Sequence, residues 1–503
     1  MGTVREHRTV VAISPLDLPH GNRLLVMNCE DCACAVTAPA GPNTLAVHER
    51  GPRVGASTVT CAPDVLVVGV DAQHSMLFNP RLEGGMLVVN RAAEEIFLSF
   101  RRPILEQDVR ERWPGSTSDF DAVFGKLLSL GMLEVGGQER RTVYAHSEVL
   151  TVWLHVTNDC NLGCPYCYVN KSPERMSDDV AFASVDRVVR SARSHSFSGI
   201  KLKYAGGEAS LNHGLVVTLQ QRARELTNQL GLSLEATILS NGVALSGAFI
   251  EFLKRENVKV MISLDGIGEA HDVQRPFVDG RGSFARVDHT IRKLLDQGLR
   301  PHLSVTISNR NCGGVADVVG YALKLGLTFS LNLFRDNDCA AKFEDLQYEE
   351  GAIISSLTEA FAVIEENLPP WSVLGAVLDR GQLIRPRERS CGVGQDYVVV
   401  DQRGGVAKCH MEIEKTIGDV FTSDPVELVR DDRTLLNLTA SEKEGCRSCT
   451  WKNWCSGGCS VATFRATGRF DVKSPNCQIY KVIYPMALRL EALRLLKYQV
   501  LLR

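Results

Sequence analysis

The chain has 503 residues, 44% of them hydrophobic, which is enough for about three domains with sizeable cores. A net charge of −3 argues against nucleic acid as a partner, and no apolar run approaches the ~20 residues of a membrane span. We therefore expect a cytoplasmic protein without a membrane partner. Because the cytosol is reducing, many of the 16 cysteines are expected to be metal ligands.

Residues 1–65 are expected to form an N-terminal extension of unclear role. The extension contains four cysteines, three of them spaced C-x2-C-x-C: Cys29, Cys32, Cys34 and Cys61. The spacing is compatible with a metal site, whereas the apolar residues around it favour buried thiols. Both interpretations stay open.

Residues 66–145 predict a hairpin, three helices and a short strand. The apolar runs Ser75–Phe78 and Met86–Val89 flank a turn at Gly84–Gly85. Helices are expected at Ala92–Phe100 after an Asn90 cap, at Ile104–Arg112 and at Ser118–Leu130, before the strand MLEV. This order is a winged-helix layout, but the acidic third helix has the wrong charge for DNA phosphates.

The same stretch resembles the peptide-recognition elements of ribosomal-peptide biosynthesis, which are related to the carrier used in pyrroloquinoline quinone assembly. The shared segments are the LFNP hairpin, LVVNRAAEEIF and the closing LLSLGML. The resemblance implies that this domain holds the leader segment of a precursor peptide as an added strand, on the sheet edge beside the third helix. The alternative is a purely structural lid.

A loop after the apolar run Val152–Val156 holds Cys160, Cys164 and Cys167, spaced C-x3-C-x2-C. Thiolates are the usual ligands of iron–sulfur clusters, normally four to a [4Fe–4S] cluster. No fourth cysteine lies nearby in the sequence, so the spacing favours a cluster with one iron open to a non-protein ligand. A zinc site or three structural thiols would be the alternative.

This spacing, with Tyr166 before the last cysteine, resembles the signature of the radical SAM superfamily. The resemblance implies that S-adenosylmethionine (SAM) binds the open iron and is cleaved to a 5′-deoxyadenosyl radical, which abstracts hydrogen. It also implies an α/β fold with a partial (β/α)6 barrel, here over residues 146–385. An external electron donor of the flavodoxin or ferredoxin type would reduce the cluster.

Strand-like runs alternate with helical segments from Thr151 onward, as in parallel βα units. The expected strands are Val152–Val156, Ile200–Tyr204, Leu234–Leu239, Val258–Leu264, Leu303–Ile307 and Thr328–Leu333. Helices are expected at Asp178–Ser194, Leu215–Leu230, Phe284–Gln297 and Val315–Leu325. Active sites of such folds lie at the carboxyl ends of the strands.

Polar motifs follow the second, third and fourth predicted strands. Gly206, Gly207 and Glu208 resemble the GGE(P) motif, with Ala209 in place of proline, which implies contact with the SAM amino group. The residues expected near its ribose are Ser240, Asn241, Ser263 and Asp265. The segment HDVQR resembles a stretch of the peptide-modifying branch, and its Arg275 is expected to pair with the SAM carboxylate. Cys312 and Cys339 match no motif and are expected to be structural.

Residues 386–503 contain seven cysteines whose pattern resembles the SPASM domain. The resemblance implies two auxiliary [4Fe–4S] clusters, three in all with the SAM-binding one. Cys446, Cys449, Cys455 and Cys477 would hold one, and Cys391, Cys409 and Cys459 would hold the other with an open iron. Two zinc sites are the alternative.

His410 directly follows Cys409, at the position of a catalytic aspartate in the sulfatase-maturing members that the pattern resembles. A histidine can act as a base near neutral pH, so His410 is a candidate catalytic residue. It is alternatively a side chain packed beside the cluster. Residues 478–503 predict a closing amphipathic helix.

These features favour a radical SAM enzyme that modifies a ribosomally synthesised precursor peptide and forms an oxidative C–C or C–heteroatom crosslink. One alternative is a maturase of a folded protein, such as a sulfatase or a dehydrogenase subunit. Another is a non-enzymatic iron–sulfur scaffold for electron transfer. That scaffold would not need the polar motifs at the strand ends.

Overall fold

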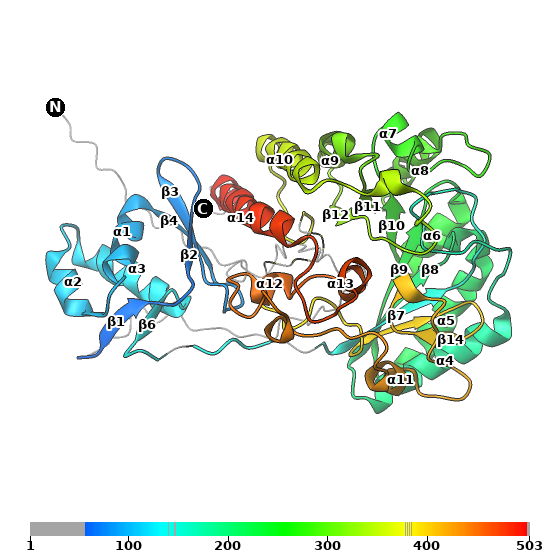
Figure 1. Cartoon of the computed structure of the whole chain (residues 1–503), viewed down its shortest axis with the longest axis horizontal. Helices are drawn as coiled ribbons and strands as arrows, with labels where there is room; N and C mark the ends of the chain where they lie inside the picture. Colours follow the sequence, from blue (N-terminus) through cyan, green and yellow to red (C-terminus); the bar gives the residue numbers. More distant parts are fainter. Residues whose placement is uncertain are drawn as a thin grey trace.

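The computed structural model describes residues 56–138, 140–144, 147–377, 379, 381, 383 and 385–499. Cys29, Cys32 and Cys34, and with them the question of an N-terminal metal site, lie outside these residues. Figure 1 shows a small N-terminal part on the left, a large α/β part on the right, and helix α14 between them. None of the helices in the described part is both long and apolar enough to cross a bilayer.

A parallel sheet of six strands, each followed by a helix, forms the large part. The strands lie in chain order: β7 (Val149–His155), β8 (Gly199–Ala205), β9 (Ser233–Ser240), β10 (Lys259–Ser263), β11 (His302–Ile307) and β12 (Phe329–Leu333). The main helices after them are α4 (Asp178–Ser194), α5 (His213–Leu230), α6 (Gly247–Arg255), α8 (Phe284–Asp296), α9 (Val315–Lys324) and α10 (Glu350–Glu366). The six predicted strands and the alternating pattern are confirmed.

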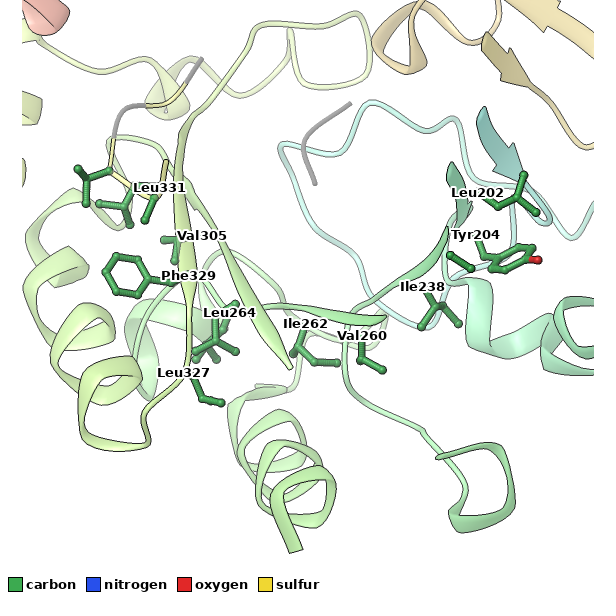
Figure 2. Packing of buried hydrophobic residues seen from close by; sticks show 14 of the residues in the cluster. Leu202, Tyr204, Ile238, Val260, Ile262, Leu264, Val305, Leu327, Phe329 and Leu331 are labelled. Carbon is green, nitrogen blue, oxygen red and sulfur yellow. The ribbon is translucent and has the colours of Figure 1, made fainter. Parts of the chain in front are cut away.

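The two faces of this sheet differ because side chains alternate along each strand. Figure 2 shows Leu202, Ile262, Phe329 and their neighbours on the face that packs against the helices. The intervening residues are often polar yet buried, including Lys203, Thr237, Ser330 and Asn332. The inner face of the sheet is therefore largely polar, and the apolar core lies between strands and helices.

Three further strands, which the sequence did not indicate, extend the sheet beyond β7. β13 (Tyr397–Val400) pairs with β7 in parallel, and β14 (Gly405–Ala407) and β15 (Gly418–Asp419) follow antiparallel. This extension attaches the C-terminal cysteine region directly to the strand that leads into the first cysteine loop. The region also contains α11 (Pro425–Asp431), α12 (Lys452–Cys455) and α13 (Ser460–Thr467).

The N-terminal part contains the predicted hairpin, three helices and short strand. A meander of β2 (Leu66–Gly69), β3 (His74–Phe78) and β4 (Met86–Asn90) precedes α1 (Arg91–Ser99), α2 (Glu106–Arg112) and α3 (Thr117–Ser129). Asn90 caps α1 as expected, with its Oδ1 accepting from Ala93 N at 2.9 Å. A Cβ on Gly85 would lie 2.7 Å from the Asn79 oxygen, which explains a glycine in this hairpin turn.

Two boundaries in this part differ from the prediction. The second helix begins at Glu106, because β5 (Ile104–Leu105) pairs with β1 (Thr58–Cys61). The predicted strand, β6 (Leu133–Val135), pairs with the other edge of β1. A strand from the expected N-terminal extension thus belongs to a sheet with elements of the following segment.

Strands β3 and β4 of the meander are buried on both faces. Leu77, Leu87 and Val89 pack with the N-terminal helices, whereas Met76 and Phe78 belong to the large core of the α/β part. Phe78 lies 4.9 Å from the ring of Trp454, whose Nε1 donates to the Pro80 oxygen at 2.7 Å. The N-terminal part therefore docks on α12, beside Cys455.

The predicted amphipathic C-terminal helix, α14 (Cys477–Gln499), is buried on more than one side. It packs against α10 and against the meander, and its buried residues include Tyr480, Tyr484, Leu488 and Ala492. Arg489 joins both neighbours, because it pairs with Glu365 of α10 and donates to the Val70 oxygen. The helix is thus buried between two parts of the fold, whereas the predicted amphipathic helix would have only one buried face.

Candidate functional site

The loop after β7 brings Cys160, Cys164 and Cys167 together at the carboxyl end of the parallel strands. Burial raises the pKa of the Cys164 thiol to about 12, and the charges of Cys167 and Cys160 act in the same direction. Arg275 opposes this shift. The Cys164 thiol is therefore buried, with Cys160 and Cys167 near enough to act on it electrostatically, and a positive iron site would favour the thiolate forms.

Two glycines at the end of β8 let this cysteine loop approach the sheet. Gly207 N donates to the Thr157 oxygen at 2.7 Å, and Glu208 N donates to the Asp159 oxygen at 2.8 Å. A Cβ on Gly206 would lie 2.4 Å from the Thr157 oxygen, and one on Gly207 would lie 2.4 Å from the Asp159 oxygen. The GGE motif thus fixes the position of the cysteine loop through its backbone.

The Glu208 carboxylate connects the ends of β8 and β9. It accepts from Ser240 Oγ at 2.8 Å and from Asn241 N at 2.5 Å. Asn241 Nδ2 in turn donates to Asn161 Oδ1 at 2.7 Å and lies 3.9 Å from Cys160 Sγ. The predicted residues Glu208, Ser240 and Asn241 therefore form one buried network beside the first cysteine.

Asp265, just after β10, is the centre of a second buried network. Its Oδ2 accepts from Tyr166 Oη at 2.6 Å and from Arg275 Nε at 2.7 Å, and its Oδ1 accepts from Thr306 N at 2.8 Å. The Arg275 guanidinium also lies over the Tyr166 ring, 5.3 Å from its centroid. Asp265 thereby positions the aromatic residue of the cysteine loop. Ser263, the last residue of β10, is half-buried at the same edge of the sheet.

Several residues near this edge had no role in the site assigned to them from the sequence. His271 Nδ1 accepts from Asp265 N at 3.2 Å, and burial lowers the pKa of His271 to about 4. Asn337 Nδ2 donates to the Tyr166 oxygen, and Cys339 Sγ lies 3.5 Å from the Tyr168 oxygen. Cys339 is therefore not remote from the site, since it contacts the cysteine loop. No local pattern could indicate this, because Cys339 is 171 residues from its partner.

The C-terminal cysteines separate into two groups in space. The outer set consists of Cys446, Cys449, Cys455 and Cys477. Burial raises the pKa of Cys455 to about 12, and the charges of the other three thiols add to the shift. The other three thiols are therefore near enough to Cys455, the last residue of α12, to act on it electrostatically, and one of them, Cys477, is the first residue of α14.

The inner set consists of Cys391, Cys409 and Cys459, which line one cavity. His410, Met411 and Leu435 also line it. Asn437 holds Cys391 in place, because its Nδ2 donates to the Cys391 oxygen at 2.7 Å. The structure thus brings together the three cysteines that the sequence grouped.

His410 lies between the inner set and the first cysteine loop. Its ring stacks on Trp153 of β7 at 4.6 Å and meets the edge of Tyr168 at 5.4 Å. Tyr397 Oη lies 3.1 Å from His410 Nδ1 and orients the imidazole. Trp153 Nε1 is buried and has no hydrogen-bond partner within the described residues. An aromatic cluster therefore joins the two cysteine sites.

These donor sets fit iron–sulfur clusters in their chemistry, because soft thiolates are the ligands that such clusters use. Among the residues that the structure describes, no three Cys, His, Asp or Glu side chains converge on a position for a single metal ion. The outer set supplies four thiols and the inner set three. The first loop supplies three thiols beside the polar networks of Glu208 and Asp265.

Comparison with known proteins adds to this geometry. Residues 154–309 match the model of the radical SAM superfamily. The sporulation killing factor maturation protein SkfB of Bacillus subtilis is 30% identical over 34% of this chain and 39% of its own length. The antilisterial bacteriocin subtilosin biosynthesis protein AlbA of the same species is 24% identical over 61% of this chain and 66% of its own length. The matches thus span less than two thirds of either Bacillus protein.

A relative of a different kind is the cysteine-type anaerobic sulfatase-maturating enzyme of Clostridium perfringens. It is 22% identical over 66% of this chain and 94% of its own length. The solved structure of native anSMEcpe with bound AdoMet and Cp18Cys peptide covers 71% of this chain and 100% of its own, with a TM-score of 0.55 and 18% identity. At that identity the likeness shows a shared fold. Residues 154–309 therefore form a radical SAM domain, and the relatives include a sporulation killing factor maturation protein, a bacteriocin biosynthesis protein and a sulfatase-maturating enzyme.

Proposed function

We propose that this protein is a radical SAM enzyme that modifies a ribosomally synthesised precursor peptide and forms an oxidative C–C or C–heteroatom crosslink. The observation that carries the proposal is the aromatic cluster of Trp153, Tyr168 and His410, which joins the first cysteine loop to the inner set. A reaction that removes hydrogen and then an electron from one substrate needs both sites within reach of it. Peptide maturation proteins among the relatives support the choice of substrate.

In this proposal Cys160, Cys164 and Cys167 hold a [4Fe–4S] cluster, and SAM binds beside it. Together they supply a 5′-deoxyadenosyl radical that abstracts hydrogen from the substrate. Glu208, Ser240 and Asn241 form one wall of the SAM pocket, and Ser263, Asp265 and Arg275 form another with Tyr166. The closeness of Asn241 to Cys160, and of the Arg275 guanidinium to the Tyr166 ring of the cysteine loop, supports both walls.

The outer and inner sets hold two auxiliary [4Fe–4S] clusters in the same proposal. The inner set has three thiols, so a cluster held there would leave one iron for a substrate atom or another ligand. An external flavodoxin or ferredoxin would provide the electron for the first cluster. Clusters held by these residues would supply an acceptor for the electron that ring closure leaves behind, as a net oxidation requires.

We assign His410 as the base that takes a proton from the substrate during closure. Its imidazole lines the inner cavity and is held by Tyr397 and Trp153 in one orientation. His410→Gln should keep SAM cleavage and lose crosslinked product. Equal product from wild type and variant would show that His410 only packs beside the cluster.

The precursor peptide would be held through its leader by the N-terminal part. The β2–β3–β4 meander has two edge strands, and an extended peptide can add to such an edge through backbone hydrogen bonds. Since the meander docks beside Cys455, a leader bound there would keep the rest of the peptide near the cysteine sites. This winged-helix-like recognition domain favours a small tethered substrate.

A folded protein substrate is the second candidate, because the sulfatase-maturating relative aligns over 94% of its own length. One experiment separates the two. The reconstituted protein is incubated anaerobically with SAM and reductant, with a peptide encoded beside its gene or with a sulfatase. A mass change in the peptide alone supports the proposal, and a modified sulfatase supports the alternative. Absence of 5′-deoxyadenosine in every sample would contradict both.

A further inference from the structure

Lys443 is a lysine buried between the two C-terminal cysteine sets. It is 1% exposed, although lysine is among the residues least often buried. Its Nζ donates to the Gly457 oxygen at 3.2 Å, and its own backbone oxygen accepts from Cys446 N at 3.2 Å. A buried ammonium is costly unless negative charge lies near it, so its surroundings should supply that charge.

The negative groups that act on Lys443 are cysteines of both sets. Burial lowers the pKa of Lys443, and the charges of Cys446, Cys455, Cys391 and Cys459 oppose that shift. The first two belong to the outer set and the last two to the inner set. The geometry agrees, because Lys443 Nζ bonds the oxygen of Gly457, which lies in the loop between Cys455 of the outer set and Cys459 of the inner set.

The backbone around Lys443 is shaped to admit its side chain. Gly457 has a φ of +75°, and a Cβ there would lie 2.4 Å from Lys443 Cδ and 2.9 Å from its Nζ. The Gly457 N–H also bonds the Cys455 thiol, so one residue touches both the ammonium and a ligand of the outer set. A glycine at this position thus gives the lysine its path to the space between the sets.

We propose that Lys443 is a counter-charge shared by two auxiliary clusters, and that its ammonium raises the midpoint potentials of both. The inference rests on the cluster assignment of the proposed function. Adding one electron to a cluster makes it more negative, and a nearby buried cation stabilises that reduced form. Cluster potentials respond to net charge and to surrounding hydrogen bonds. Because water is excluded around Lys443, its charge acts with little screening.

The test is a redox titration of the reconstituted protein followed by electron paramagnetic resonance. Lys443→Met removes the charge, Lys443→Gln keeps a donor for the Gly457 oxygen, and Lys443→Arg keeps a positive charge. The control is Lys473→Met, because the charge of Lys473 also acts on Cys446 and Cys477 but from an exposed position. Iron and sulfide contents are measured first for every variant.

The expected result is a shift of both auxiliary potentials to more negative values in Lys443→Met and Lys443→Gln. The potential of the SAM-binding cluster should not move, and Lys443→Arg and Lys473→Met should stay close to wild type. Unchanged auxiliary potentials in proteins with iron for three clusters would overturn this inference alone. Loss of the clusters in all three Lys443 variants would also overturn it, since Lys443 would then only fill space. Iron for a single cluster in wild type would overturn the auxiliary sites themselves.

Discussion

Replacing Asp265 by asparagine should show that this residue stabilises the fold, which an ion pair at the surface would do only weakly. Asp265 is fully buried, and its two oxygens accept from Tyr166 Oη, Arg275 Nε and Thr306 N. Asp265→Asn keeps the size of the side chain but removes its charge. One oxygen also becomes an NH₂ group, which cannot accept from the donors that face it.

The magnitude follows from the burial of the partner. The Arg275 side chain is 11% exposed, so the variant leaves a guanidinium inside the protein without its carboxylate. Removing one partner of a buried ion pair costs roughly 3–5 kcal/mol. Because Tyr166 Oη loses its acceptor as well, the cysteine loop that carries Cys164 and Cys167 should also become less ordered.

Urea denaturation and iron content are the measurements. Asp265→Asn should lower the free energy of unfolding by about 3 kcal/mol and reduce the iron bound. Asp279→Asn is a matched control, because Asp279 and Arg281 lie 2.7 Å apart at the surface, and exposed pairs add little. If both variants unfold like wild type and bind equal iron, the Asp265 network does not position the loop.

Three more predictions follow from single contacts. Gly207→Ala should bind less iron at the first cysteine loop, because its Cβ would lie 2.4 Å from the Asp159 oxygen; metal analysis showing full iron would contradict this. As the pH falls below 6.5, the free energy of unfolding should decrease less in His271→Gln than in wild type. Denaturation at several pH values measures this. The pKa of His271 is about 4 in the folded protein and about 6.5 in the unfolded chain. Between these two pH values only the unfolded chain takes up this proton, which lowers the free energy of unfolding of wild type by about 3 kcal/mol in total. Trp454→Phe loses the bond to the Pro80 oxygen, worth about 1 kcal/mol, and should speed proteolytic release of the N-terminal part; an unchanged cleavage rate would count against this docking contact.

The barrel and its polar edge could be predicted because their signals are local. Apolar runs marked each strand, and the residues after the strands, such as Glu208 and Asn241, had to meet because parallel strands end at one edge. The hydrogen-bond partners of these residues within the protein were harder to predict. Asp265 was expected near a ribose, yet its carboxylate accepts from Tyr166 and Arg275, through side-chain pairings that no spacing encodes.

Contacts between distant segments account for the rest. Cys339 matches no motif, although it lies against the cysteine loop, and β13 joins β7 from the far end of the chain. The last helix showed one apolar stripe, whereas α14 is buried between α10 and the meander. Lys443 is an ordinary lysine in the sequence, and only the fold places its ammonium on the oxygen of Gly457, in the loop between Cys455 and Cys459.

Deuterium transfer from the substrate is the most direct test of the central claim. The precursor peptide is made with deuterium at its carbon-bound positions and incubated anaerobically with the reconstituted protein, SAM and reductant. We predict that 5′-deoxyadenosine gains deuterium and that the peptide loses two hydrogen atoms for each crosslink, at least one of them as deuterium. Unlabelled 5′-deoxyadenosine together with an unchanged peptide would contradict hydrogen abstraction from this substrate.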